Sequence, residues 1–184
     1  RGRLFLEAHS DLFECPLCHQ QVFANESGLI CLNRHRFDLS KKGTLFFLDH
    51  PVKTEYDQGM FVPRSRMIQS GMYRPVLEGI SHQIEQSENI LDIGCGEGSF
   101  LAQLLAGQEK TAVGFDIAKE GIYLATNHAA SAFWCVADLT NLPFAPASFD
   151  TILNLFSPSN YQEFDRILKP GGQVIKVVPA ASYL

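Results

Sequence analysis

The chain has 184 residues, of which 46% are hydrophobic and 19% charged, and its formal net charge is −5. This balance is typical of a folded globular protein and excludes a disordered chain. No apolar run approaches the roughly 20 residues that a membrane-spanning helix requires. The first residues also lack the apolar core and cleavage site of a signal peptide, so the sequence predicts a cytoplasmic protein without a membrane partner.

The charges are distributed unevenly along the chain. Residues 1–75 carry ten Lys and Arg against eight Asp and Glu, whereas residues 76–184 carry five against twelve. A basic half is the one expected to meet phosphates, and a solvated basic face is the alternative explanation of this mild excess. The basic side chains concerned are Arg34, Arg36, Lys41, Lys42, Lys53, Arg64, Arg66 and Arg74.

Three of the five cysteines lie near the N-terminus, in the spacing Cys15-x2-Cys18-x12-Cys31-x3-His35. Two Cys separated by two residues can bind one ion from a tight turn. A second pair about a dozen residues later completes a tetrahedron when a hairpin brings it back. Short strands on either side of an Asn-Glu-Ser-Gly turn would form that hairpin. Three thiolates and one imidazole leave no open position, so the pattern predicts structural Zn²⁺; unrelated buried cysteines beside a surface histidine are the alternative.

The segment after the cysteines contains a predicted connector followed by a predicted helical region. Residues 49–63 contain turn and breaker residues with no sustained period and are predicted to be a connector. From about Arg64 to Glu88, apolar residues recur at helical spacing. This region is therefore predicted to hold one or two helices, broken near Gly71 and Pro75.

The stretch NILDIGCGEGSFLAQLLAG predicts a buried strand over 89–93, a glycine loop and a helix that begins at Ser99. Glycines in such a loop let a nucleotide approach the backbone without a Cβ in the way. The Gly-x-Gly-x-Gly spacing differs from the Gly-x-Gly-x-x-Gly spacing of dinucleotide binders. A second strand over 111–117 carries Asp116 about 20 residues further on, where an acid can accept hydrogen bonds from a ribose diol.

Three further strands are predicted, over 133–137, 149–156 and 173–178, with a helix over 162–168 before the last. Strands and helices alternate at βαβ intervals. The predicted fold class is therefore α/β, with a doubly wound, mostly parallel sheet and a small N-terminal zinc-binding module. The ligand is expected across the C-terminal ends of the strands.

Five segments of this second half, taken together, resemble class I S-adenosylmethionine-dependent methyltransferases. They are LDIGCGEG at 91–98, GFDI at 114–117, ADL at 137–139, LPF with SFD between 142 and 150, and LKPGG at 168–172. The resemblance implies a Rossmann-like methyltransferase sheet whose Gly94, Gly96 and Gly98 line the methionine and ribose parts of the cofactor. It implies that Asp116 holds the ribose hydroxyls and Asp138 the adenine amine, with solvated strand ends as the alternative reading of both.

The first half narrows the resemblance. The Cys15, Cys18, Cys31 and His35 site is followed by HRFD and a Lys-Lys-Gly turn, and RMI and SGMYRP precede the glycine loop. This combination is similar to the bacterial 23S ribosomal RNA (guanine-N1)-methyltransferases, the group that includes macrolide-resistance enzymes. The resemblance implies Zn²⁺ on the four ligands and a 23S rRNA hairpin as partner. The implied reaction moves a methyl group from S-adenosylmethionine to guanine N1 and leaves S-adenosylhomocysteine.

The resemblance also implies a domain plan and a cofactor site. The plan is a zinc-binding RNA-recognition module at 12–50, a linker and helices at 51–88, and the methyltransferase domain at 89–184. A class I sheet normally has seven strands and this sequence stops after the fifth, so the last strands are expected to be missing and one sheet edge exposed. The predicted cofactor contacts are Tyr73, Asp92, Gly94, Cys95, Gly96, Glu97, Gly98, Asp116, Ile117, Asp138, Leu139 and Tyr183.

The residues after the fourth predicted strand are the candidates for contact with the substrate. The proton on guanine N1 must leave, which requires a general base or a set of hydrogen bonds, and a stacked guanine must first be extruded. Position alone predicts Phe156 as a stacking face and Asn154 or Ser157 as polar contacts. A small-molecule methyltransferase of the quinone type and a non-catalytic zinc-dependent RNA-binding factor are the alternatives. A homodimer is compatible with the sequence.

Overall fold

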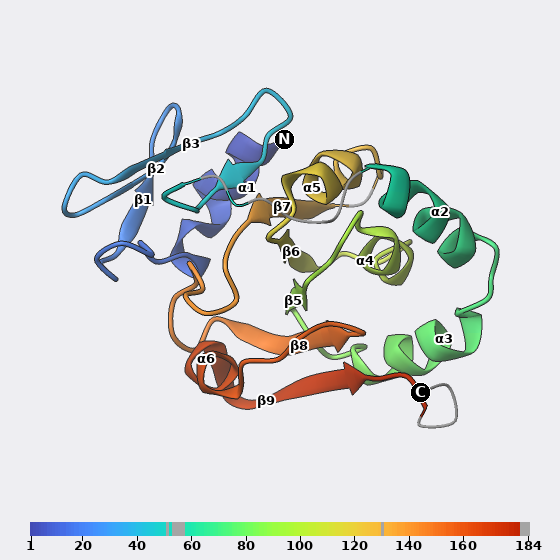
Figure 1. The fold of residues 1–184 in the computed structure, drawn as a ribbon. Coiled ribbons are helices and arrows are strands. Elements are labelled where there is room, and N and C mark those ends of the chain that lie inside the picture. Colours follow the sequence, from blue (N-terminus) through green and yellow to red (C-terminus); the bar gives the residue numbers. More distant parts are fainter. Residues whose placement is uncertain (51, 53–57, 130, 181–184) are drawn as a thin grey trace.

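The computed structural model describes every residue except 51, 53–57, 130 and 181–184. Its centre is a sheet of six strands in the order β4-β7-β6-β5-β8-β9, in which every neighbouring pair is parallel (Figure 1). The strands are β4 (Leu45–Phe46), β5 (Asn89–Ile93), β6 (Thr111–Asp116), β7 (Ala132–Val136), β8 (Phe149–Leu155) and β9 (Leu168–Val177). This arrangement confirms the predicted α/β class and parallel sheet.

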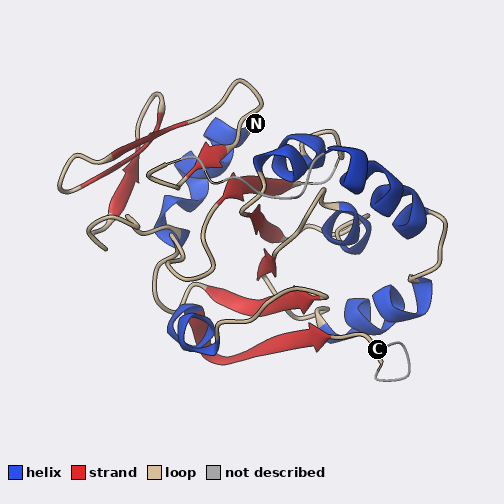
Figure 2. Cartoon of the chain, viewed as in Figure 1, coloured by secondary structure: helices blue, strands red, loops and turns tan. Residues whose placement is uncertain are grey.

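Helices cover both faces of the sheet, as expected of a doubly wound fold (Figure 2). Alternate residues of each strand face opposite sides, so Leu91 and Val113 contribute to one buried cluster while Ile90 and Ala112 contribute to the other. The first cluster includes residues of α1 (Gly2–His9), the short helix η1 (Ser10–Leu12) and α6 (Tyr161–Ile167). The second includes residues of α2 (Gln58–Gln69), α3 (Arg74–Gln83), α4 (Ser99–Leu104) and α5 (Lys119–Ala125).

The N-terminal module, residues 12–50, contains a small antiparallel sheet of its own. Its strands are β1 (Val22–Ala24), β2 (Gly28–Cys31) and β3 (Arg36–Asp38), in the order β1-β2-β3. The module then contributes β4 to the main sheet, where Leu45 pairs with Cys135 of β7. The strand added by the module therefore covers a sheet edge that would otherwise be open.

Several elements differ from the sequence-based expectation. The helix α2 begins at Gln58, inside the predicted connector, and continues through Pro63, so the prediction of a connector up to residue 63 was wrong. The helix α1 and strand β4 were not predicted. Leu6 and Leu45 are nevertheless fully buried, because both elements pack on residues distant in sequence. The strand β9 begins at Leu168, so the predicted Lys-Pro-Gly-Gly stop is part of an edge strand, the position where proline is tolerated.

Candidate cofactor cleft and zinc site

The four predicted metal ligands converge at one end of the N-terminal module. Cys15 and Cys18 lie in one tight turn, and Cys31 and His35 lie in a second turn at the end of β2. The Sγ atoms of Cys18 and Cys31 are 3.6 Å apart, and Nδ1 of His35 lies 3.4 Å from the Sγ atoms of both Cys15 and Cys31. All four donor atoms lie within 4.8 Å of one another.

This geometry fits a tetrahedral zinc ion. Bonds of about 2.3 Å to sulfur and 2.0–2.1 Å to nitrogen give edges of about 3.8 Å between sulfurs and 3.5 Å between sulfur and nitrogen. The separations of 3.4–3.6 Å given above are close to these edges. His19, which follows Cys18 directly, is exposed and lies beside Glu14 instead, so it is outside the group. The donor set is closed, and the chemistry of such a site is structural.

The module is joined to the main sheet by a dense set of polar contacts. The Arg166 guanidinium forms an ion pair with Glu14 at 3.1 Å and also donates to the carbonyls of Leu142 and Phe144. The Asn141 amide donates to the carbonyl of Pro16, inside the turn that carries the first two cysteines. These contacts connect the zinc site to the loop that leaves β7.

Aromatic packing reinforces the same junction. The ring of Phe13 lies 5.7 Å from those of Phe133 and Phe144 and 5.9 Å from that of Phe47. Phe13 and Phe144 also form a β-bridge, so backbone and side chains join at one place. The module and the sheet therefore share one hydrophobic core.

The glycine loop between β5 and α4 is held in a conformation that only glycine adopts readily. Gly94, Gly96 and Gly98 have φ of +62°, +58° and +85°. A Cβ on Gly94 would lie 2.9 Å from Cβ of Ser157, and a Cβ on Gly98 would lie 2.7 Å from the Trp134 ring. The loop backbone is therefore packed closely against side chains of the sheet and of the β8 loop, and of its three glycines Gly94 lines the cleft described below.

The Asp116 carboxylate at the end of β6 braces this loop. One oxygen accepts a hydrogen bond from the Gly96 N–H at 2.9 Å, and the other accepts from the Ala118 N–H at 2.9 Å. Each carboxylate oxygen can accept more than one hydrogen bond, so capacity remains for a ligand hydroxyl. Asp138, after β7, accepts from both the backbone and the hydroxyl of Thr140.

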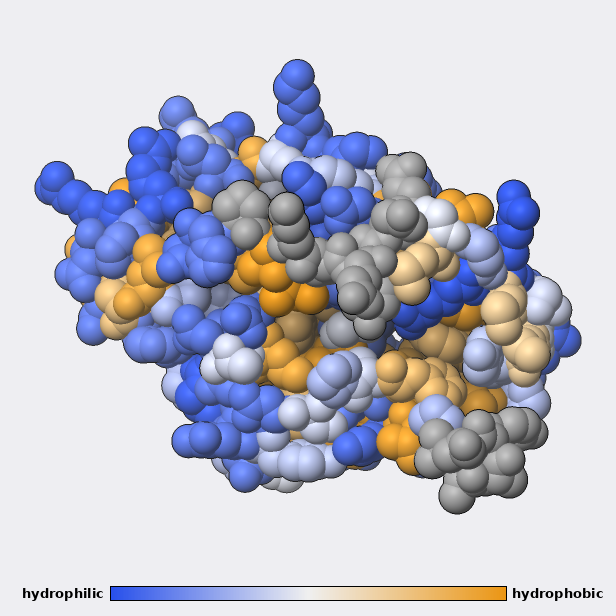
Figure 3. Space-filling view, viewed as in Figure 1, coloured by the Kyte–Doolittle hydropathy of each residue, from blue (hydrophilic) through white to orange (hydrophobic). Residues whose placement is uncertain are grey.

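A cleft of about 260 Å³ opens at the carboxyl ends of β5, β6, β7 and β8. Figure 3 shows orange, hydrophobic residues in the hollowed middle of this face and blue, hydrophilic ones over the N-terminal module. We call this space the cofactor cleft. It is lined by Phe61, Arg64, Ile93, Gly94, Phe115, Asp116, Ile117, Ala137, Asp138, Leu139, Phe156, Ser157 and Pro158.

The predicted site residues divide into three groups. Seven line the cofactor cleft: Gly94, Asp116, Ile117, Asp138, Leu139, Phe156 and Ser157. Five are buried in or under the glycine loop: Asp92, Cys95, Gly96, Glu97 and Gly98. Tyr73 and Asn154 stand apart from the lining, and Tyr183 lies outside the described residues.

Asp92 is buried at the end of β5, under the loop. Its burial raises the pKa of the carboxyl to about 7; the Arg64 guanidinium opposes this rise, and the carboxylates of Asp116 and Glu97 add to it.

Phe156 and Asn154 play opposite roles at the end of β8. Phe156 has φ of +54° and an exposed ring, which lies 5.8 Å from the ring of Tyr73 and 6.0 Å from that of Phe100. Asn154 is fully buried, and its amide donates to Ser157 and to the carbonyl of Pro158. The buried amide therefore shapes the loop that presents Phe156 and Ser157 to the cleft.

Of the six lining residues that were not predicted as site residues, two stand out, Phe61 and Arg64. Both come from α2, whose position over the cleft depends on packing, because Ile68 of this helix is buried with α4 residues in the second cluster. The basic character of Arg64 was the single local signal. The sequence alone does not show in which direction α2, which precedes β5, crosses the cleft.

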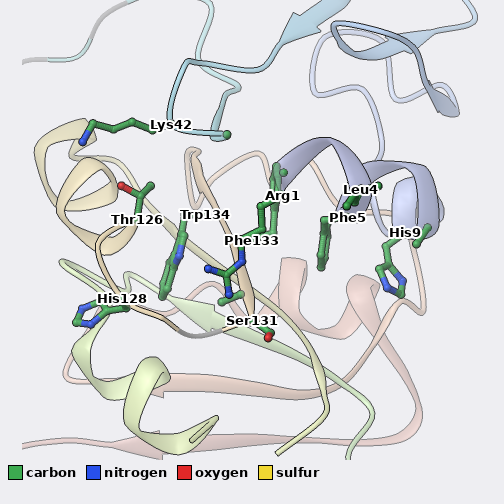
Figure 4. Close-up of a pocket in the computed structure, with 14 residues that line it drawn as sticks. Arg1, Leu4, Phe5, His9, Lys42, Thr126, His128, Ser131, Phe133 and Trp134 are labelled. Atoms are coloured by element: carbon green, nitrogen blue, oxygen red, sulfur yellow. The ribbon is translucent and has the colours of Figure 1, made fainter.

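A separate cavity of about 340 Å³ lies at the amino end of β7, between α1 and α5 (Figure 4). Arg1, His9, Lys42 and His128 are among its lining residues. It is at the opposite end of β7 from Asp138 and so forms no part of the cofactor cleft. No helix in the described part of the chain is both long and apolar enough to span a bilayer.

The fold and the cleft define a class of protein, and comparison with known proteins agrees. Residues 90–172 match the family described as "Methyltransferase domain", and residues 13–54 match the zinc ribbon described as "RlmA, N-terminal". The structure resembles a protein of Methanococcus maripaludis provisionally named an S-adenosyl-L-methionine-dependent methyltransferase. The TM-score is 0.57 at 20% identity, over 68% of this chain and 65% of that one. This likeness shows the fold: a class I methyltransferase.

Two curated relatives make the assignment more specific. A Bacillus subtilis (strain 168) protein provisionally named 23S rRNA (guanine-N(1)-)-methyltransferase YxjB is 42% identical over 94% of this chain and 66% of its own length. The 23S rRNA (guanine(748)-N(1))-methyltransferase of Streptomyces fradiae is 30% identical over 92% and 64%. The chain is thus homologous to these relatives over nearly all of its length, and in it a zinc ribbon precedes a class I methyltransferase domain. It spans just under two thirds of their length.

The residues present fit both groups that the family implies. The Cys15, Cys18, Cys31 and His35 donors fit zinc by distance and by chemistry. The Gly94 backbone and the carboxylates of Asp116 and Asp138, which line the cleft at the ends of β5, β6 and β7, fit S-adenosylmethionine. They offer close approach to the backbone and acceptors for hydroxyl and amine groups. The sequence-based recognition of the family is thus confirmed.

Proposed function

We propose that this protein transfers a methyl group from S-adenosylmethionine to N1 of a guanine in a 23S rRNA hairpin. The observation that carries the proposal is the pairing of a class I cofactor cleft with a closed Cys₃His module on the same hydrophobic core. The names of the two relatives supply the substrate, since both are called 23S rRNA guanine-N1 methyltransferases.

The chain's own residues would hold the cofactor in a fixed orientation. S-Adenosylmethionine, when bound, supplies an electrophilic methyl group on a sulfonium. The glycine loop would receive its methionine and ribose parts, and the Asp116 carboxylate would accept hydrogen bonds from the ribose hydroxyls. Asp138 and Leu139, at the end of β7, would contact the adenine. Methyl transfer needs in-line placement of the nucleophile, so this fixed orientation supplies much of the rate.

The exposed ring of Phe156 would stack on the extruded guanine. Guanine N1 would then take the methyl group, S-adenosylhomocysteine would leave, and the N1 proton would pass to a base or to water. The Ser157 hydroxyl donates to the carbonyl of Ile93 and accepts from the Asn154 amide, so one lone pair would remain to accept a hydrogen bond from the base. Asn154 would act as a positioning residue, because its amide holds the Ser157 loop.

The N-terminal module would grip the RNA. Its cations Arg34, Arg36, Lys41 and Lys42 are exposed, and hydrophilic residues dominate its surface in Figure 3. Lys and Arg side chains on such a surface bind phosphates without regard to sequence, which positions the hairpin over the cleft. The zinc ion keeps the two ligand turns together and so keeps these cations in place.

The test supplies labelled S-adenosylmethionine with unmodified 23S rRNA, free or in ribosomes, and maps the modified nucleotide. We expect one guanine methylated at N1. Phe156→Ala should lower turnover by about 5- to 150-fold while S-adenosylhomocysteine affinity is kept, as a stacked base contributes about 1–3 kcal/mol. Tyr123→Ala, which removes an exposed aromatic on α5 outside the cleft, is the matched control.

Three outcomes would contradict the proposal. Label that enters small-molecule extracts alone would indicate a small-molecule methyltransferase of the quinone type. Tight rRNA binding without label would indicate a non-catalytic RNA-binding factor. Methylation at another atom would overturn the N1 assignment. The homodimer stays a prediction, which light scattering with and without rRNA can check.

A further inference from the structure

Arg64 holds a distinctive position in the cofactor cleft. It projects from α2, and among the described residues that line the cleft it is the single cation. Its guanidinium lies directly over the glycine loop, since a Cβ placed on Gly96 would be 2.5 Å from Nη1 and 3.1 Å from Cζ. The guanidinium thus covers the Gly96 side of the loop, and both Arg64 and Gly94 line the cleft.

The guanidinium is held from behind by two groups of the same loop and helix. Its Nε lies 4.0 Å from Oε1 of Glu97, and its Cζ lies 5.8 Å from the centroid of the Phe100 ring. The Glu97 side chain is 3% exposed, and its other oxygen accepts hydrogen bonds from the Ser99 N–H and hydroxyl. Because Nε is the atom nearest to Glu97, the Nη1 and Nη2 atoms remain beside Gly96 and the cleft.

The charges around the cleft leave one role open for this cation. Asp116 and Asp138 are acceptors suited to hydroxyls and amines, whereas the amino-acid end of the cofactor carries a carboxylate. A planar guanidinium can bind a carboxylate through two parallel N–H···O hydrogen bonds. This paired interaction is stronger and more directional than the contact that a lysine ammonium makes. Such a bond also needs a counter-ion that does not occupy the same N–H groups, as Glu97 provides from the Nε side.

We propose that Arg64 binds the α-carboxylate of S-adenosylmethionine and S-adenosylhomocysteine, with Glu97 and Phe100 as the residues that position it. The inference rests on the cofactor named in the proposed function but not on the RNA substrate. It makes α2, which lies outside the methyltransferase-domain match at residues 90–172, a part of the cofactor site.

The test compares two ligands that differ at the amino-acid end. S-Adenosylhomocysteine carries the carboxylate, and 5′-methylthioadenosine lacks the whole amino-acid group. Binding of each is measured by titration calorimetry on the wild-type protein and on Arg64→Met, which keeps an unbranched apolar stem over Phe100. We expect S-adenosylhomocysteine affinity to fall by about 10- to 100-fold and methylthioadenosine affinity to change by less than about twofold.

Two further variants sharpen the comparison. Arg66→Met removes a neighbouring exposed cation that does not line the cleft, and both affinities should be unchanged. Arg64→Lys keeps the charge but loses the paired geometry, so its S-adenosylhomocysteine affinity should fall between those of wild type and Arg64→Met.

The outcomes separate this inference from the proposed function. Equal weakening of both ligands by Arg64→Met would show that Arg64 merely supports the loop, and would overturn the inference. Unchanged S-adenosylhomocysteine affinity with weakened rRNA binding would assign Arg64 to an RNA phosphate and would also overturn it. A normal ligand pattern without rRNA methylation would instead contradict the proposed function alone. Failure of the wild-type protein to bind S-adenosylhomocysteine would contradict both.

Discussion

The N-terminal module and the cofactor cleft reach rigidity by different means. In the module, four donor atoms from two short turns fix the geometry, and its three strands have four residues at most. In the cleft, bare glycines fit closely against Trp134 and Ser157, and buried hydrogen bonds fix the loops. The N-terminal module therefore depends on a single removable ion, whereas the cofactor cleft depends on many small packing contacts.

The two regions nevertheless share the Phe13 cluster and the Arg166 contacts, so damage to either one is transmitted. The zinc site can therefore hold a loop of the cofactor cleft at a distance. The loop after β7 that carries Asp138 is fixed to the cysteine turn by Asn141.

Removal of a zinc ligand should have the largest effect. His35→Ala leaves three thiolates and an open position, and structural zinc contributes about 10–16 kcal/mol in small zinc-binding peptides. We expect zinc content well below one ion per chain and a thermal midpoint lowered by more than about 10 °C. His19→Ala, at an exposed histidine beside Cys18, should match wild type in both measurements. Equal zinc content in the two variants would remove His35 from the ligand set.

Damage to the glycine loop should have the next largest effect. In Gly98→Ala the new methyl group meets the Trp134 ring at 2.7 Å and Ala125 at 3.0 Å, at a φ of +85°. Strain and overpacking together should lower the unfolding free energy by about 2–5 kcal/mol, measured by urea denaturation. Gly107→Ala has a similar φ of +72° but open space, so it should lose only about 1–2 kcal/mol. Equal losses would mean that the Trp134 contact carries no weight.

Breaking the junction should have a smaller effect. Arg166→Met leaves the Glu14 and Glu163 carboxylates without their partner and two carbonyls without a donor. We expect a loss of about 2–3 kcal/mol in unfolding free energy, with weaker S-adenosylhomocysteine binding. The control Arg3→Met breaks an exposed pair with Glu7 and should cost less than about 0.5 kcal/mol. Unchanged cofactor binding in Arg166→Met would indicate that the two regions are independent.

The change expected over a single pH unit is smaller still, and it is a pH dependence at Asp92. Burial raises the pKa of this carboxyl from its ordinary value of 3.8 to about 7, so the folded state binds a proton that the unfolded state releases. The stability that this proton gives is fully present below pH 4 and is lost as pH rises through 7. Relative to Asp92→Asn, the unfolding free energy of wild type should fall by up to about 1.4 kcal/mol per pH unit in this window. Parallel curves for the two proteins would contradict the raised pKa.

Local patterns predicted the chemistry and the central strands. The Cys and His spacing brings four donors together because each pair is confined to one tight turn. The alternating strands and helices predicted β5 to β9, since strands buried on both faces read as continuous apolar runs. The glycine loop and Asp116 could be predicted because a positive φ favours glycine and because Asp116 ends an apolar strand, and both patterns can be read in the sequence.

Features that depend on packing between residues distant in sequence could not be predicted from local patterns. The two residues of β4 are too short for a periodic signal, and their strand state comes from pairing with β7. Pro63 suggested a break, yet α2 runs through it because Phe61 and Ile68 on either side are buried. Asn154 was predicted as a substrate contact from its place after a strand. Its side chain instead lies under the Ser157 loop, a direction that sequence position does not determine.

The pairing of β4 with β7 also has a consequence for synthesis of the chain. Phe13 and Leu45 leave the ribosome before their partners in β7 and at Phe144 have been translated. With about 130 residues between Phe13 and Phe144 and about 5–20 residues added per second, the gap lasts roughly 7–26 s. Zinc can bind the nascent cysteine turns during that interval, but the aromatic face beneath them stays uncovered until the sheet arrives. The metal site can therefore form before the hydrophobic core that it shares with the sheet.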